Sequence, residues 1–242
     1  EMCIRDSLKV SKNTGLYATV FNRSKERDIT ADEMARPAVG MKYSKVIFVG
    51  DSRTVGMYAT LNKQIGSSSS SGVSFVASAG QGLSWFQSEG YAKLLKEVEK
   101  AEGSLPVAVV FNLGVNDMAN ASNYVSYMTN IASTLKSKNC KLFYMSVNPL
   151  NSTMITKAGK GSRTEAQVRE FNSKIRSGLS ANYKYIDTYS VLMKTGYGTN
   201  ASYNGEDSVS DDGLHYTTKT FKRIYYYCVI YLNTGSIDSF YY

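Results

Sequence analysis

The only histidine of the chain lies in a pattern suited to acid–base chemistry. His215 is the single histidine among 242 residues and follows Asp212 by three positions, in the run Asp-Gly-Leu-His. An unperturbed imidazole titrates near neutral pH. The spacing allows the Asp212 carboxylate to accept the Nδ1–H, which leaves Nε2 able to take a proton from a serine. We therefore predict that these two residues form an acid–base pair, and that the adjacent Asp211 has a capping or surface role.

A serine that could act as the nucleophile lies in the run Gly-Asp-Ser-Arg at 50–53. It follows an apolar stretch and begins a segment with helical spacing, so Ser52 is expected where a strand passes into a helix. The backbone N–H groups of a helix start favour a developing negative charge beside the Ser52 oxygen. Serine and aspartate are also preferred helix N-caps, so this run alone leaves both interpretations open.

Two further turns could supply hydrogen-bond donors to the same place. The run Gly-Gln-Gly-Leu-Ser at 80–84 contains glycines that let backbone N–H groups approach a ligand closely, and we expect Ser84 to cap the helix that follows. The run Gly-Val-Asn-Asp at 114–117 offers the side-chain amide of Asn116. Glycine and asparagine are also common turn residues, so each run alone is ambiguous.

Alternating strands and helices would bring these four runs together. Apolar runs rich in Val, Ile, Phe and Tyr predict strands at 45–49, 73–77, 107–113, 141–147 and 183–186. Helical spacing predicts helices at 53–64, 84–101, 123–138, 163–179 and 217–232. Five alternations are typical of an α/β protein with a parallel sheet and helices on both faces. Such sheets bind ligands at the carboxyl ends of their strands, where all four runs are expected to lie.

With these runs in this order, the chain resembles the SGNH hydrolase family of GDSL-like esterases. The resemblance covers about 44–233 and includes Phe171-Asn172 in the fourth predicted helix. The third run and the last run match the family pattern in full. The resemblance implies a three-layer α/β/α sandwich with a flavodoxin-like, five-stranded parallel sheet.

The resemblance also implies a role for each matching residue. Ser52 would be the nucleophile, His215 the general base and Asp212 the residue that orients it. The oxyanion hole would comprise the N–H groups of Ser52 and Gly82 and the side-chain amide of Asn116.

The chain departs from the family pattern at two points. Arg53 replaces the leucine of the GDSL motif, which argues against a lipase-type subclass. The second run lacks the usual leading asparagine, so either Gly80 or Gly82 could supply the donor. We prefer Gly82 because Ser84, two positions later, begins the predicted helix.

Substrate contacts are expected from residues near the predicted active edge. We predict that Arg53, Trp85 and Tyr216 contact the substrate, and aromatic rings there, including those of Tyr197 and Tyr203, could stack on sugars. The loop that follows the fourth predicted strand carries three basic residues without an acidic one and could form a basic rim over the site: Lys157, Lys160 and Arg163.

These features favour hydrolysis of a short ester, with acetyl on a carbohydrate as the expected substrate. The loops are small and rich in Ser, Gly and Asn, and no long apolar lid is visible. Three alternatives use or retain the same residues: an O-acyltransferase, a lysophospholipase or thioesterase, and a non-catalytic glycan-binding module.

Composition excludes several other classes. There are 28 Lys and Arg against 20 Asp and Glu, giving a net charge of +8, but the basic residues form no dense run and no nucleic-acid recognition motif is present. One histidine and three scattered cysteines predict no metal site, and no phosphate-binding loop or other cofactor motif occurs. Apolar runs are shorter than the roughly 18 residues of a membrane span. We expect neither nucleic acid nor a cofactor as a partner; oligomeric state is left open.

The chain is expected to consist of one hydrolase domain with extensions. We assign 1–43 to an N-terminal extension, 44–233 to the hydrolase domain and 234–242 to a C-terminal tail. Residues 1–7 suggest an assembly scar, and the rest of the extension suggests the end of a preceding module with a strand-like run at 16–21. Long loops are predicted at 148–162 and 188–212, and a polar linker at 67–71. No signal peptide is visible, and the polar, cysteine-poor composition suggests an extracytoplasmic or secreted bacterial enzyme.

Overall fold

The computed structural model describes residue 29 and residues 42–65 and 72–237. Most of the predicted N-terminal extension, including its strand-like run at 16–21 and the suggested scar at 1–7, lies outside these residues. So do the polar linker at 67–71 and the tail beyond 237.

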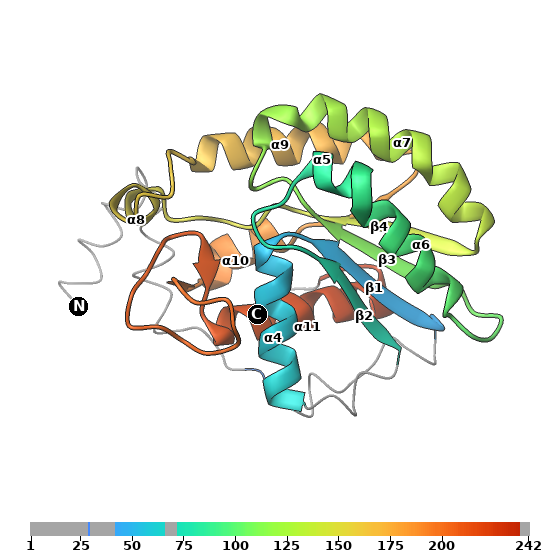
Figure 1. The fold of residues 1–242 in the computed structure, drawn as a ribbon, viewed down its shortest axis with the longest axis horizontal. Coiled ribbons are helices and arrows are strands. Elements are labelled where there is room, and N and C mark those ends of the chain that lie inside the picture. Colours follow the sequence, from blue (N-terminus) through green and yellow to red (C-terminus); the bar gives the residue numbers. More distant parts are fainter. Residues whose placement is uncertain (1–28, 30–41, 66–71, 238–242) are drawn as a thin grey trace.

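A five-stranded parallel sheet forms the centre of the molecule (Figure 1). Its strand order is β2-β1-β3-β4-β5, as expected for a flavodoxin-like sheet. The order reverses direction between β1 and β3, and ligands of such sheets bind at this point. The strands are β1 (Lys45–Gly50), β2 (Val73–Ala77), β3 (Val107–Asn112), β4 (Cys140–Met145) and β5 (Lys184–Ile186).

Helices connect the strands, and a small second sheet lies before the last helix. The predicted helices are all present, although several boundaries differ. In chain order the helical elements are α4 (Ser52–Ile65), α5 (Leu83–Trp85), the π-helix η3 (Phe86–Gly90), α6 (Tyr91–Glu99), the 3-10 helix η4 (Met118–Asn120), α7 (Ala121–Ser137), α8 (Ser152–Lys157), α9 (Glu165–Gly178), α10 (Thr188–Thr195) and α11 (Thr218–Thr234). The second sheet pairs β6 (Thr199–Asn200) antiparallel with β7 (His215–Tyr216).

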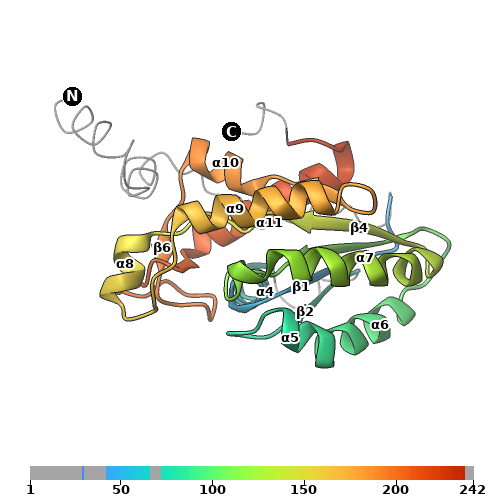
Figure 2. The same ribbon diagram turned by 90° about the horizontal axis from the view of Figure 1, so that it is seen from above.

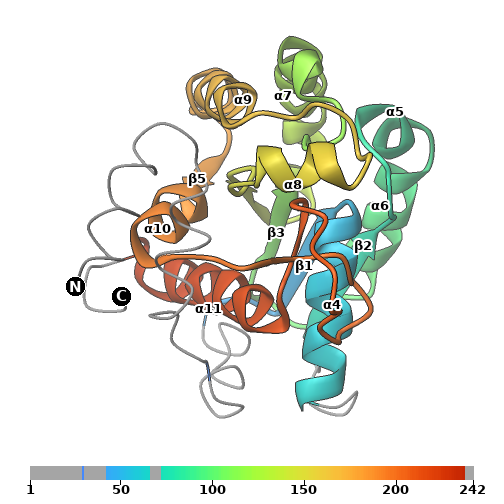
Figure 3. The ribbon, with the colours of Figure 1, turned by 90° about the vertical axis from the view of Figure 1, so that its left-hand side faces the viewer.

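Alternating side chains of the strands pack on opposite faces and so create three layers. In β1, Ile47 and Val49 join a core cluster with α5, α6, α7 and α9, whereas Val46 and Phe48 join a second cluster with α4, α10 and α11. Figures 2 and 3 show these two helix layers on either side of the sheet. The predicted three-layer α/β/α architecture is therefore confirmed.

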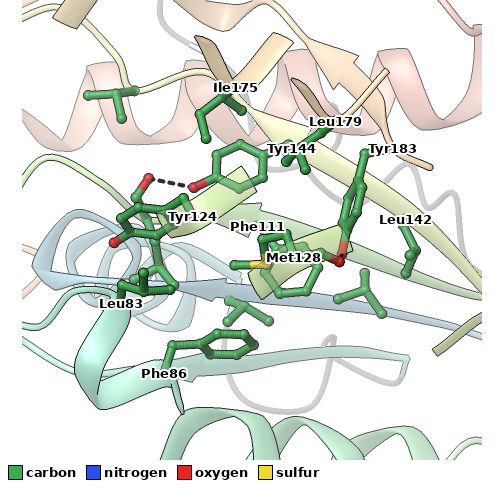
Figure 4. Packing of buried hydrophobic residues seen from close by; sticks show 14 of the residues in the cluster. Leu83, Phe86, Phe111, Tyr124, Met128, Leu142, Tyr144, Ile175, Leu179 and Tyr183 are labelled. Carbon is green, nitrogen blue, oxygen red and sulfur yellow. Dashed lines mark hydrogen bonds between the residues drawn. The ribbon is translucent and has the colours of Figure 1, made fainter. Parts of the chain in front are cut away.

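Tyrosines occupy the first cluster with their hydroxyl groups hydrogen-bonded (Figure 4). Tyr144 donates to the carbonyl of Leu113 at 3.0 Å, and Tyr183 donates to the carbonyl of Met128 at 2.8 Å. A buried hydroxyl without a partner would cost about 1–3 kcal/mol. These bonds therefore let large aromatic rings fill the core, and the bond of Tyr144 ties β4 to the segment after β3.

Three local predictions need correction. Ser84 does not cap a helix: α5 begins at Leu83, with Gly82 at the N-cap and no side-chain cap. The helix predicted at 84–101 is divided into α5, η3 and α6, and Gly90, where η3 ends, packs directly on the rings of Phe86 and Trp85. The loops predicted at 148–162 and 188–212 contain α8, and α10 with β6, respectively. These short elements depend on tertiary packing more than on propensity.

Among the described residues, no helix is both long and apolar enough to cross a membrane.

Candidate active site

The ends of β1 and β3 and the segment before α11 meet at one edge of the sheet. Figure 3 looks onto this edge, with the start of α4 beside β1 and with α8 and the segment that leads into α11 in front. Ser52 is the first residue of α4, and His215 lies in β7, where it pairs with Asn200. Residues far apart in the chain are thus brought to the place that the sequence predicts.

A chain of short hydrogen bonds links the three predicted triad residues. His215 Nε2 lies 2.8 Å from Ser52 Oγ, and Nδ1 lies 2.7 Å from Asp212 Oδ2. The other Asp212 oxygen accepts the backbone N–H groups of Leu214 and His215, both at 2.9 Å. Burial acts to raise the pKa of Asp212, but these hydrogen bonds and the His215 charge outweigh it and lower the pKa below its usual value. Asp212 therefore stays ionised at neutral pH and can orient His215.

Asp51, rather than Ser52, caps the start of α4. The Asp51 carboxylate accepts the N–H of Arg53 at 2.9 Å, and its carbonyl accepts the N–H of Val55 at 3.0 Å. The Ser52 hydroxyl is consequently free to bond to His215. This geometry separates the two roles that the run at 50–53 left open.

The Asp51 carboxyl is fully buried at the site. Burial raises its pKa to about 6, while the Arg53 charge, the Arg53 backbone bond and the His215 charge act to lower it, and Asp117 acts to raise it. The pKa of Asp51 therefore depends on the charges of Arg53, His215 and Asp117.

Asp117 joins the second and third predicted runs. Its Oδ2 accepts the N–H of Leu83 at 2.9 Å, and its Oδ1 accepts the hydroxyl of Tyr124 at 2.7 Å. A Cβ added to Gly82 would lie only 2.4–2.8 Å from the Asp117 carboxylate, so this close approach requires glycine. A Cβ on Gly80, in contrast, would meet nothing within 4 Å. It is thus Gly82 that lies against the turn containing Asn116.

Partners on both sides hold the Asn116 side chain. Its Nδ2 donates to the carbonyl of Gln81 at 2.8 Å, and its Oδ1 accepts from Arg163 Nη2 at 3.2 Å. Because one Nδ2 proton is used by Gln81, the second remains for a ligand. The amide is thereby tied to the turn that contains Gly82.

Phe171 and Asn172 of α9 contact the segments that follow β3 and β4. Asn172 accepts the N–H of Val147 and donates to its carbonyl, both at 2.8 Å, which fixes the chain just after β4. Gly114 has a φ of 124°, and a Cβ there would lie 2.3 Å from the Phe171 ring. The family-like pair in the fourth predicted helix therefore has a structural role.

The three residues that the sequence predicts as substrate contacts, Arg53, Trp85 and Tyr216, are buried, as Ser52 and His215 are, and they have partners within the protein. Arg53 donates from Nε to the carbonyl of Leu214 and from Nη1 to that of Asn148, both at 2.9 Å. Its guanidinium also lies 4.8 Å from the centre of the Tyr216 ring, and the Tyr216 hydroxyl donates to the carbonyl of Pro149. Trp85 belongs to the first core cluster. Arg53 and Tyr216 thus brace the backbone beside His215.

Sequence reasoning assigned no individual role to two residues that the structure places near the site. Tyr203 packs on His215 with ring centres 4.8 Å apart and remains 42% exposed. Glu165 accepts the N–H of Leu150 at 2.6 Å and the hydroxyl of Tyr189 at 2.7 Å. Tyr203 was one of several aromatic candidates in the sequence, whereas nothing in the spacing indicated Glu165, because both of its partners are distant in the chain.

The three residues of the expected basic rim differ in their surroundings. Lys157 and Lys160 are exposed, but Arg163 turns inward toward Asn116. No group of three or more His, Cys, Asp or Glu side chains within residues 42–65 and 72–237 is placed to hold a metal ion.

The fold and this hydrogen-bonded Ser–His–Asp chain define the class: an α/β protein with the constellation of a serine hydrolase. The family model of the GDSL-like lipases and acylhydrolases matches residues 45–227. The chain belongs to this family and is a carboxylic ester hydrolase, as its resemblance to SGNH hydrolases implied.

Several solved structures share the fold at low sequence identity. A protein described as an SGNH hydrolase from Slackia heliotrinireducens has a TM-score of 0.54 and 11% identity, covering 78% of this chain and 100% of its own. A lipolytic G-D-S-L family protein from Veillonella parvula has a TM-score of 0.50 and 16% identity over 78% of this chain and 98% of its own. A structure described as a platelet activating factor from Streptococcus pneumonia has a TM-score of 0.51 and 14% identity, over 94% and 99%. No curated protein matches the chain in sequence.

Proposed function

We propose that this protein is a serine esterase that removes short acyl groups, acetyl foremost, from the hydroxyl groups of carbohydrates. The observation that carries the catalytic part of the proposal is the chain from Ser52 Oγ through His215 to Asp212, with distances of 2.8 and 2.7 Å. These distances fit a serine whose proton can pass directly to the imidazole.

The reaction would proceed through an acyl-enzyme. Ser52 Oγ attacks the ester carbonyl while His215 Nε2 takes its proton, and Asp212 accepts the Nδ1–H throughout. The backbone N–H groups of Ser52 and Gly82 and the free Nδ2–H of Asn116 stabilise the oxyanion of the tetrahedral intermediate. When that intermediate collapses, the ester C–O bond breaks and His215 gives its proton to the leaving alcohol. Water, activated by His215, then adds to the acyl-enzyme and releases the acid and Ser52.

The position of Tyr203 favours a sugar as the alcohol part of the ester. Its ring packs on His215, which must lie next to the leaving oxygen, and the side chain is 42% exposed. A half-exposed aromatic ring at this point offers a flat apolar surface to a sugar ring.

The small number of exposed apolar side chains favours a substrate with a short acyl group. Within the described residues, the large apolar side chains that are exposed are Tyr58, Leu105, Tyr203 and Val209. A long acyl chain needs a continuous apolar surface, and four exposed side chains offer little apolar area.

The first test is hydrolysis of p-nitrophenyl acetate, butyrate and octanoate, together with acetate release from acetylated xylan and peptidoglycan. We expect turnover of acetyl esters that falls by about 10⁴–10⁶ in Ser52→Ala, whereas Ser84→Ala, at an exposed serine, leaves it unchanged. Preference for octanoate would replace the proposal with a lysophospholipase or thioesterase. Serine-dependent transfer that requires a sugar acceptor would indicate an acyltransferase, and ligand binding without turnover a glycan-binding module.

The carbohydrate part has its own test. Tyr203→Ala should lower kcat/KM for an acetylated xylo-oligosaccharide about tenfold, through loss of stacking, but should change ethyl acetate hydrolysis by less than about twofold. Tyr203→Phe keeps the ring and should resemble the wild type on both. Equal losses of Tyr203→Ala on both esters would contradict a role in sugar binding.

A further inference from the structure

Arg163 lies directly behind the Asn116 amide. Its guanidinium donates from Nη2 to Asn116 Oδ1 at 3.2 Å, from Nε to the carbonyl of Val115 at 2.9 Å and from Nη1 to the carbonyl of Lys160 at 2.6 Å. The side chain thus contacts both the backbone and the side chain of the turn that holds Asn116.

These contacts decide which end of the amide faces Gln81. The two ends of an asparagine amide have nearly the same shape, so packing alone does not distinguish an N–H from a carbonyl oxygen. The Gln81 carbonyl can only accept a hydrogen bond and the Arg163 guanidinium can only donate one. Together they permit one orientation, in which Nδ2 lies on the Gln81 side with its second proton available. In the flipped orientation a carbonyl oxygen would repel an oxyanion.

The backbone that carries Arg163 is itself fixed. The next residue, Thr164, is the N-cap of α9 and forms a capping box with Gln167. Glu165 then holds the N–H of Leu150 and the hydroxyl of Tyr189. Arg163 therefore directly precedes a helix start whose position these hydrogen bonds fix, so its guanidinium is held close to Asn116.

The positive charge of Arg163 adds to this geometric effect. Burial and the nearby Arg53 lower the pKa of Arg163, and Asp51 acts to raise it, but arginine stays protonated in proteins. A cation at the oxygen end of an amide polarises it, which makes the N–H at the other end a stronger donor.

We propose that Arg163 is a positioning residue of the oxyanion hole, which orients and polarises the Asn116 amide without touching the substrate. This inference rests on the proposed esterase mechanism with Asn116 as a donor. Its effect therefore belongs to the transition state and should appear in kcat more than in KM.

A double-mutant cycle separates this role from simple support of the loop. We expect Arg163→Met to lower kcat on p-nitrophenyl acetate by about 10–100-fold, somewhat less than deletion of the Asn116 donor itself. Within the Asn116→Ala background the same substitution should cost less than about threefold, because the group it positions is gone. KM should stay within about twofold in both backgrounds.

Two further variants complete the design. Arg163→Lys keeps the charge but not the three-way fork, so we expect it to recover part of the lost kcat. Lys157→Met, a basic residue of the same segment that is exposed, should behave as the wild type. Thermal unfolding of each variant identifies any that fail to fold.

A transition-state analogue gives a second readout. Methylboronic acid adds to a catalytic serine as a tetrahedral anion, and Arg163→Met should weaken its inhibition constant in parallel with kcat. Equal losses from Arg163→Met in both Asn116 backgrounds, or a kcat within twofold of wild type, would overturn the proposal. Those results would leave the esterase mechanism standing as long as Ser52→Ala remains inactive.

Discussion

The two sides of Ser52 are built in different ways. On the acid–base side, Asp212 and His215 lie three residues apart, and one carboxylate both accepts the His215 Nδ1–H and holds the local backbone. On the donor side, Gly82 and Asn116 follow different strands and meet only through contacts between segments distant in the chain: Asp117 to Leu83, Asn116 to Gln81 and Arg163 to Asn116. The first side is a local motif placed as a unit, whereas the second side exists only in the assembled fold.

This difference predicts how each side fails. Substitutions on the acid–base side should abolish the chemistry with little effect on neighbouring segments. Substitutions on the donor side should have smaller effects on kcat that depend on one another.

The largest effect is expected for Asp212→Asn. The asparagine would donate to His215 Nδ1 and so place the imidazole proton on Nε2, where it cannot accept the proton of Ser52. We expect kcat to fall by about 10³–10⁴-fold, measured on p-nitrophenyl acetate. Asp211→Asn is the matched control, since Asp211 bonds to Gly213 and Thr199 rather than to His215. Comparable losses in both variants would refute the local motif.

A smaller loss is expected for Asn116→Ala. Removal of one oxyanion donor typically lowers kcat by about 10²–10³-fold, and KM should change little. Asn116→Asp keeps the shape but replaces the donor with a negative acceptor, so it should be at least as inactive. Full activity in the alanine variant would remove Asn116 from the oxyanion hole.

Gly82→Ala tests the contact between the two turns of the donor side. The added Cβ would overlap the Asp117 carboxylate, and overpacking of this kind costs about 1–3 kcal/mol. We expect a lower midpoint of unfolding and a kcat reduced about tenfold as the turn shifts. Gly80→Ala faces open space, although its positive φ of 74° is strained, so it should lose some stability but keep its kcat. The reverse pattern would assign the donor to Gly80.

Asp51 interacts with both sides of the site, with the charge of His215 and with that of Asp117. We expect Asp51→Asn to change the stability of the protein rather than its reaction. Burial raises the pKa of Asp51 in the folded state to about 6, from 3.8. The folded protein therefore binds this proton more tightly than the unfolded chain, and the wild type loses stability as pH rises from about 4 to about 6. The asparagine variant has no such group but keeps an oxygen to cap Arg53.

The measurement is urea unfolding of both proteins at pH 4 and pH 7. From pH 4 to pH 7 the wild type should lose on the order of 1–3 kcal/mol more free energy of unfolding than the variant loses. If the free energy of unfolding changed equally with pH in both proteins, the pKa of Asp51 would not be raised by folding.

Sequence patterns predicted the strands, the helices and the pair of Asp212 and His215 because each depends on local information. Buried parallel strands read as apolar runs, and the Asp-x-x-His spacing lies within one turn of chain. The patterns did not show which partners within the protein the side chains beside the candidate triad would bind. Arg53 and Tyr216 lie in sequence beside Ser52 and His215, yet both are buried, and their hydrogen bonds go to carbonyls of segments distant in the chain: those of Asn148, Pro149 and Leu214.

By itself, the sequence determined the α/β class and the order of the strands along the chain, and it predicted Ser52, Asp212 and His215 as the candidate triad. Hydrophobic periodicity is sufficient for the strands and helices, and short-range spacing for the pair Asp212 and His215, whereas Ser52 is singled out only by the family resemblance. Only the tertiary structure decided that Asp51 caps α4 so that Ser52 is free, that Gly82 rather than Gly80 lies against Asp117, and that Arg163 turns inward to Asn116. Each of these depends on which hydrogen-bond partner or neighbouring atom arrives from a distant segment, and local sequence carries no record of that.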